Sequence, residues 1–192
     1  MKEKLNKQGV LSFLKKYGYI IALATIMLVL SIILIVSANN DEVIDNKPVN
    51  ADPISFYSPL LTYTIAKDYN DTNLVYNTTL KQWEAHKGIC FTAPENSEVF
   101  ACLDGVVEDV YSNHLSGTVV VINHSNNLKT YYSSLNENVA VKKGDTVTKG
   151  DVIGRVGVTG NSELELGNHL HFEVTENNVK VDPSIYLNLE NK

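Results

Sequence analysis

One long apolar segment stands apart from the rest of the chain. Residues 18–38 read "GYIIALATIMLVLSIILIVSA", without a charged side chain. At about 1.5 Å per residue this run makes a helix of about 31 Å, which matches the core of a bilayer. Five lysines precede it in 1–17 and three carboxylates follow it closely, an asymmetry that keeps the N-terminus in the cytoplasm. The pattern predicts a cytoplasmic stub (1–17), a transmembrane helix (18–38) and an extracytoplasmic remainder.

The same run has a second interpretation as a cleaved signal peptide. It ends in "VSA", which resembles the small-residue motif at a cleavage site. The apolar region of a signal peptide is about 7–15 residues long, and this run is longer. Its length favours an uncleaved anchor.

The polarity of the chain changes abruptly after the apolar run. Residues 39–53, "NNDEVIDNKPVNADP", are polar, contain two prolines and show no periodicity, which predicts a tether. Residues 54–85 are rich in Tyr, Thr, Ile and Leu with "DYNDTN" in the middle, which predicts membrane-proximal strands separated by a turn.

From residue 86 onward, short apolar stretches alternate with glycine-rich turns. Segments such as "GTVVVINHSNN" and "VKKGDTVTKGDVIGRVG" have the length and composition of strands. No stretch after residue 39 sustains a helical period. The pattern predicts an all-β domain with a mostly antiparallel sheet.

Composition and charge narrow the class of partner. The chain has 192 residues and is 44% hydrophobic, enough for one modest domain. Five of its 16 basic and one of its 22 acidic side chains lie in 1–38, which leaves 11 basic and 21 acidic, a balance of −10, in 39–192. Such an acidic domain is a poor binder of nucleic acid, so we expect none.

Two short motifs carry chemistry. In "GNHLHFEV", His169 and His171 are two apart, so on a strand both imidazoles project from the same face. In "HKGIC", His86 and Cys90 are four apart and would also share a face of a strand. Two histidines and a thiolate could form a three-ligand zinc site with an open position.

These motifs and the segments between them resemble the peptidase M23 (LytM or lysostaphin-type) family. The resemblance covers residues 86–187 and is most specific in 141–174, from "VKKGDTVTKGDVIGRVG" to "GNHLHFEV". It implies an antiparallel β-sheet domain. It also implies a zinc site, and peptidoglycan cross-bridges or stem peptides as the substrate of active members.

Matched residue by residue, the resemblance implies a degenerate site. His86 and His171 stand at zinc-ligand positions and His169 at a catalytic position. Cys90 stands where the family has an aspartate ligand, and Ser134 in "YYSSL" where it has its other catalytic histidine.

Both departures argue against hydrolysis. Serine is no base near neutral pH, and losing a proton-transfer group typically costs about 10²–10⁴ in rate. Thiolate is a competent zinc ligand, but it donates more charge to the metal and leaves a bound water less acidic. We therefore expect no functional catalytic residue and no required cofactor. His86, Cys90 and His171 would form a vestigial zinc site that binds zinc weakly or not at all.

Cys90 has a further use that excludes zinc. The other cysteine is Cys102, and "PENS" at 94–97 looks like the turn of a hairpin that would place the two nearly opposite. An extracytoplasmic location permits a disulfide. Two free thiols packed as small hydrophobic side chains are the other alternative. A disulfide or free thiols are favoured over zinc ligation.

The order of segments, with one span, a tether and one degenerate M23 domain, resembles a class of membrane-anchored sporulation proteins. The resemblance implies a place in the forespore membrane, with the domain in the intermembrane space. There it would bind a stage III sporulation protein AH-like protein of the mother-cell membrane, as part of a channel. The alternatives are a zinc-dependent peptidoglycan endopeptidase, and an activator or scaffold for another cell-wall hydrolase that contacts peptidoglycan.

Overall fold

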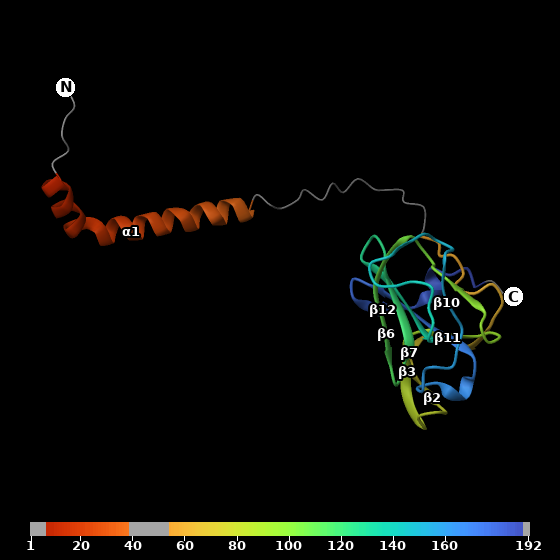
Figure 1. The fold of residues 1–192 in the computed structure, drawn as a ribbon. Helices are drawn as coiled ribbons and strands as arrows, with labels where there is room; N and C mark the ends of the chain where they lie inside the picture. The colour runs from red at the N-terminus through yellow and green to blue at the C-terminus, as the bar shows by residue number, and fades with distance from the viewer. Residues whose placement is uncertain (1–6, 39–53, 190–192) are drawn as a thin grey trace. The chain divides into compact units, whose positions relative to one another are not determined.

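The computed structural model describes residues 7–38 and 54–189 (Figure 1). The chain divides into two compact units, Met1–Ala51 and Asp52–Lys192. The predicted tether, 39–53, lies outside the described residues, as do residues 1–6 of the predicted stub.

The first unit contains one helix, α1 (Lys7–Ala38), which begins well before the apolar run. Its segment Phe13–Ile32 has a mean hydropathy of 1.6, and none of its residues is classed as buried. Thr25 and Ser31 donate their hydroxyl hydrogens to carbonyl oxygens one turn back, at 2.8 Å each, so these polar groups are satisfied within the helix. The segment is long and apolar enough to cross a bilayer.

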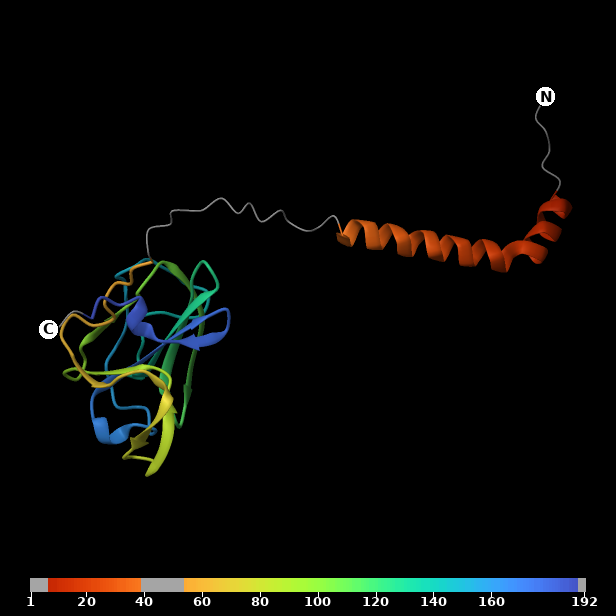
Figure 2. The ribbon, with the colours of Figure 1, turned by 180° about the vertical axis from the view of Figure 1, so that it is seen from behind.

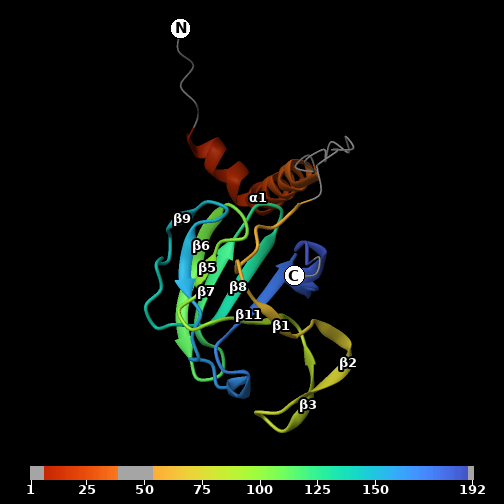
Figure 3. The same ribbon diagram turned by 90° about the vertical axis from the view of Figure 1, so that its right-hand side faces the viewer.

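The second unit is built on one antiparallel sheet, as the sequence predicts (Figure 3). Its order is β1-β4-β11-β8-β7-β6-β9, and β12 pairs with β11 beside this path. The strands are β1 (Thr64–Lys67), β4 (Ile89–Thr92), β6 (Gly105–Asn113), β7 (Gly117–Asn123), β8 (Leu128–Leu135), β9 (Thr146–Val147), β11 (His169–Glu176) and β12 (Val179–Val181).

A small second sheet completes the hydrophobic core. It pairs β5 (Glu98–Phe100) with β10 (Val152–Arg155), and these strands contribute Val99 and Ile153 to the same core as Phe91, Tyr132 and Phe172 of the main sheet. All five side chains are almost completely buried. Two short 3-10 helices, η1 (Leu164–Leu166) and η2 (Pro183–Ile185), lie on either side of β11 and β12 in the sequence.

A hairpin of β2 (Asn70–Asn77) and β3 (Gln82–His86) projects from one end of the domain (Figures 2 and 3). The turn predicted at "DYNDTN" is wrong in part, because 70–73 belong to β2. The pairing jumps from Asn70↔His86 to Val75↔Glu84, so this polar stretch forms an irregularity in the strand. The hairpin's own turn falls at 78–81.

The hairpin predicted around 94–97 is also wrong, and the disulfide between Cys90 and Cys102 with it. β4 pairs with β1 and β11, whereas β5 pairs with β10, so the strands on either side of "PENS" belong to different sheets. Both cysteines are free and buried. Burial raises the pKa of the Cys102 thiol to about 12, so this thiol is protonated and behaves as a small apolar side chain.

Candidate metal centre and cleft

The register between β4 and β11 brings two parts of the predicted site together. His171 lies opposite Cys90 in this antiparallel pair. His86 ends β3, and a Cβ on Gly88 would come within 2.8 Å of the His171 ring, so the chain passes too close for a side chain there. His86 and Cys90 lie on different strands, β3 and β4. Even so, Cys90 Sγ is 3.3 Å from His86 Nε2 and 3.2 Å from His171 Nδ1.

A fourth donor, Glu163, joins these three. Its Oε2 lies 3.0 Å from Cys90 Sγ and 2.8 Å from His171 Nδ1, and its Oε1 lies 3.4 Å from His86 Nε2. One ligand atom from each of the four residues lies within 4.8 Å of all the others. The Glu163 side chain comes from the loop that precedes β11 and is almost completely buried.

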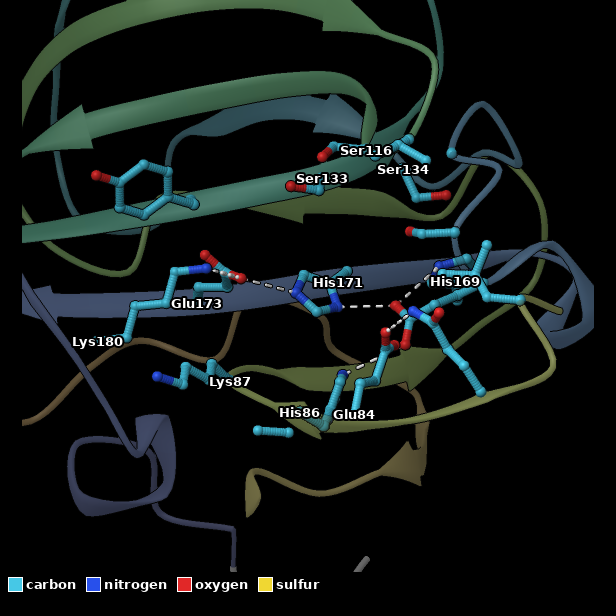
Figure 4. Close-up of a pocket in the computed structure, with 18 of the residues that line it drawn as sticks. Glu84, His86, Lys87, Ser116, Ser133, Ser134, His169, His171, Glu173 and Lys180 are labelled. Carbon is cyan, nitrogen blue, oxygen red and sulfur yellow. Dashed lines mark hydrogen bonds and ion pairs between the residues drawn. The ribbon is translucent and has the colours of Figure 1, made fainter. Parts of the chain in front are cut away.

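Three of the four groups are oriented by a neighbour outside the cluster. His86 Nδ1 donates to the Asp68 carbonyl oxygen at 2.7 Å, which leaves Nε2 facing the cluster. His171 Nε2 lies 3.1 Å from Glu173 Oε1, and this oxygen also accepts from Lys180 Nζ (Figure 4). Lys67 of β1 donates to Glu163 Oε1 at 2.7 Å. Carbonyl and carboxylate partners of this kind fix the ring orientation of metal-binding histidines.

The electrostatics of the cluster favour charged groups in spite of burial. Burial alone would raise the pKa of Glu163, but hydrogen bonds from His171 and His86 hold it well below its usual range. Burial alone would lower the pKa of His86, but contacts with Cys90 and Glu163 raise it to about 9. The pKa of His171 is raised for the same reason. The site therefore gathers charge where a metal ion would take the place of protons.

The donor set fits zinc. Zinc prefers thiolate, imidazole and carboxylate ligands in a tetrahedron, and its bond lengths of about 2.0–2.3 Å put neighbouring ligand atoms about 3.3–3.6 Å apart. Most of the separations above are a few tenths of an ångström shorter than this, as hydrogen bonds between the same atoms would be. Small side-chain movements would bring all four donors to coordination distance.

His169 and Ser134 lie next to the cluster. His169 Nδ1 donates to the Gly167 carbonyl oxygen at 2.7 Å, and its Nε2 is 3.9 Å from Glu163 Oε2. Burial lowers the pKa of His169, so this imidazole is neutral at physiological pH. Ser134 stands at an irregularity in the pairing of β8 with β7, at a φ of 63°. Among the described residues its buried hydroxyl has no hydrogen-bond partner.

The cluster forms part of the wall of an open cleft of about 630 Å³ (Figure 4). Histidines, serines, tyrosines and charged residues line it, including Glu84, Ser116, Tyr111, Tyr131 and Ser133. The hairpin β2–β3 contributes one side and the strands β6, β8 and β11 the other. The cluster is thus reached from an open, polar cleft between the hairpin and the sheet.

Sequence reasoning found His86, Cys90 and His171 and missed Glu163. The available signal was "GNSELELGN", a loop with two carboxylates directly before the H-x-H strand. Neither spacing nor charge distinguishes Glu163 from Glu165 in that loop, since only the fold shows that the former is buried and the latter exposed.

Comparisons with known proteins point to one family. The profile described as "Peptidase family M23" matches residues 84–183. The chain is 33% identical over 138 residues to stage II sporulation protein Q of Bacillus subtilis, which is 70% of this chain and 47% of that protein. It is 35% identical over 126 residues to the peptidoglycan DD-endopeptidase ShyC of Vibrio cholerae, which is 66% of this chain and 28% of that protein. The chain therefore spans less than half the length of these curated relatives.

A solved structure gives the same picture. A chain of the "SpoIIQ-SpoIIIAH pore forming complex" superposes with a TM-score of 0.61 at 27% identity, covering 70% of this chain and 92% of that one.

Proposed function

The chain belongs to peptidase family M23, and from this premise we propose that it is a membrane-anchored, non-catalytic member that works by binding. It would work in a sporulation channel between forespore and mother cell. Its partner there would be a stage III sporulation protein AH-like protein, anchored in the mother-cell membrane and met across the intermembrane space.

The observation that carries the proposal is the extent of the structural match. The domain superposes on nearly the whole of a chain from a complex named for SpoIIQ and SpoIIIAH, and among the curated relatives it covers 47% of stage II sporulation protein Q against 28% of the endopeptidase ShyC. Because fold alone does not decide function, the altered site supplies the second line of support.

The residues at the site support the absence of hydrolysis. When bound, zinc would be held by His86, Cys90 and His171, and it would supply a polarised water and stabilise developing negative charge. Removing the proton from that water and steadying the oxyanion would be the task of protein side chains. Ser134 offers no base for this task. His169 Nε2 lies 3.9 Å from Glu163 Oε2, so a buried carboxylate stands beside this imidazole.

The anchor is the other part of the proposal. Helix α1 is apolar and long enough for one span, and the lysines of 1–17 favour a cytoplasmic N-terminus. The domain would then lie outside the cytoplasm, attached to the forespore membrane.

The outer edge of β6, beyond Val107, is one strand edge that could receive a partner. β9 pairs with β6 at Gly105 and Val106 only, and no other described strand pairs with the rest of this edge. The Val110 amide donates to its neighbour's carboxylate, Asp109 Oδ1, at 3.1 Å. An edge with backbone groups free of a neighbouring strand can be extended by a strand of another protein.

Co-purification tests the binding function. The full chain is co-expressed with a tagged stage III sporulation protein AH homologue, and the membranes are solubilised in detergent. We expect both proteins to elute together through a second column. A parallel digestion of purified peptidoglycan should release no muropeptides above a buffer control. Muropeptide release without co-elution would favour the endopeptidase. If neither co-elution nor muropeptide release is observed, the channel is not supported. Stimulation of an added wall hydrolase would then favour an activator.

A further inference from the structure

The Glu163 carboxylate lies among the three ligands that the family resemblance implies. We propose that Glu163 is the fourth ligand of a zinc site formed with His86, Cys90 and His171, and that it closes this site to water and substrate. Structural zinc sites have four protein ligands, whereas catalytic sites keep one position open. The site would be a structural zinc site that holds strands together, at the place where an active relative would have its catalytic zinc.

The two oxygens of Glu163 have different surroundings. Oε2 is the atom near Cys90 Sγ, at 3.0 Å, and near His171 Nδ1, at 2.8 Å. Oε1 accepts from Lys67 Nζ at 2.7 Å. Oε2 is thus directed at two of the other donors, whereas Oε1 is held by an ammonium group and lies 3.4 Å from the third donor, His86 Nε2. This is the arrangement expected of a carboxylate that coordinates through a single oxygen.

The loop that carries Glu163 is fixed to the hairpin. Asn77 Nδ2 donates to the Ser162 carbonyl oxygen at 3.0 Å, and the Glu165 amide donates to Thr79 Oγ1 at 3.1 Å. These contacts hold the residues on both sides of Glu163. The carboxylate therefore belongs to the built structure of the site and is not a surface group that happens to fold inward.

Burial supports the same conclusion. Glu163 is 5% exposed, and a carboxylate is rarely buried so deeply without a cation or metal partner. Lys67 neutralises one charge, but Cys90, when ionised as a ligand, adds another. A divalent ion would offset the charge that the thiolate adds.

A closed site would join segments that are distant in the sequence. Its ligands come from β3, β4, β11 and the loop before β11, and Lys67 adds β1. This inference goes beyond the proposed function, because such a tie would form whichever partner the domain binds. It also reverses the sequence-based expectation of weak zinc, since that expectation counted three ligands.

Cobalt substitution tests the closed site. The full chain in detergent is loaded with one equivalent of Co²⁺, whose visible spectrum reports four-coordinate geometry and whose near-ultraviolet spectrum reports thiolate ligation. Azide is then added as a small external ligand. We expect a tetrahedral, thiolate-ligated spectrum that azide leaves unchanged, because no coordination position is open.

Two variants sharpen the test. Glu163→Ala should weaken Co²⁺ and Zn²⁺ binding by at least about tenfold and make the spectrum respond to azide. Glu165→Ala, from the exposed neighbour in the same loop, should behave as the wild type. A wild-type spectrum that shifts with azide would overturn the proposal, as would a wild-type chain that takes up neither ion. The azide result on the wild type decides the matter even where Glu163→Ala does not fold, and no readout involves the protein partner.

Discussion

At the residue scale, Ser134 holds a backbone conformation that serine rarely adopts. Its φ of 63° lies in the left-handed region, which costs a non-glycine residue about 1–2 kcal/mol. Its hydroxyl is buried with no hydrogen-bond partner among the residues that the structure describes. This position, at which the family resemblance implies a catalytic histidine, therefore contributes strain.

Replacing Ser134 with glycine should stabilise the domain. Glycine adopts this φ freely, so the backbone strain is relieved. This relief exceeds the entropic cost of glycine's greater freedom in the unfolded chain by about 0.5–1 kcal/mol. Thermal unfolding followed by circular dichroism measures the change. The matched control is Ser133→Gly, one residue earlier on the same strand, which should lose about 1 kcal/mol. An equal loss in both variants would show that the φ of Ser134 carries no strain.

His124 should make the domain sensitive to acid. It is buried, its Nδ1 donates to the Asp104 carbonyl oxygen and its Nε2 lies 2.8 Å from Thr130 Oγ1. Burial lowers its pKa below the value of about 6.5 in the unfolded chain. The unfolded state then binds more protons as the pH falls below about 6.5, so stability contributed by the neutral ring is lost in that direction.

The variant His124→Gln removes this titration. We expect it to be less stable at neutral pH by about 1 kcal/mol, from its imperfect hydrogen bonds, and to lose less stability than the wild type between neutral and mildly acidic pH. Unfolding midpoints across that range provide the measurement, with the exposed His114→Gln as control. Parallel pH profiles for wild type and His124→Gln would refute this role.

Several residues of the site could be predicted from sequence because motif spacing survives in the fold. His86, Cys90 and His171 meet as the resemblance implies, and His169 lies beside them. Glu163 and Lys67 could not be predicted, since each reaches the cluster only through the path of a loop or an edge strand. The pairing of Cys90 with Cys102 failed because two nearby strands joined different sheets, which local pattern does not reveal.

At the element scale, the all-β architecture follows from the alternation of apolar stretches and turns, but strand partners do not. The segment "DYNDTN" has the composition of a turn and is drawn mostly into β2, because the hairpin β2–β3 tolerates an irregularity there. Tertiary pairing thus overrides local turn propensity at a strand that has few constraints on its exposed face.

The free edge of β6 should become protected when the partner binds. If the partner adds a strand there, amides in the peptide covering Gly105–Asn113 will exchange more slowly in the complex, by at least about tenfold. Hydrogen exchange followed by mass spectrometry measures this, and the buried strand β7 (Gly117–Asn123) provides an internal control that should not change. Protection confined to the hairpin β2–β3 would move the interface to that hairpin.

At the scale of the whole molecule, the proposed function divides the work of the two units between anchoring and binding. No residue in the candidate span of helix α1 is buried, whereas the β domain encloses its own hydrophobic core. An acidic domain of this kind depends on a specific partner and not on general attraction to nucleic acid or anionic lipid.

This division predicts one topology. Alkaline phosphatase fused after Lys192 should be active, because this enzyme folds only after export. Green fluorescent protein fused at the same place should not fluoresce, because it does not fold when it is exported as an unfolded chain. Replacing the lysines of 1–17 by glutamate should reduce the phosphatase activity of the fusion. A fluorescent fusion with inactive phosphatase would place the domain in the cytoplasm and rule out the proposed partner.

The central claim is that the domain binds a partner and does not need the family's catalytic group to do so. The measurement is a titration of the detergent-solubilised full chain with the soluble domain of a stage III sporulation protein AH homologue. It is done for the wild type and for His169→Ala, which leaves all four proposed zinc ligands in place. The account predicts saturable binding with dissociation constants equal within about twofold, a difference below about 0.5 kcal/mol. Absence of saturable binding by the wild type, or its loss in a correctly folded His169→Ala variant, would contradict it.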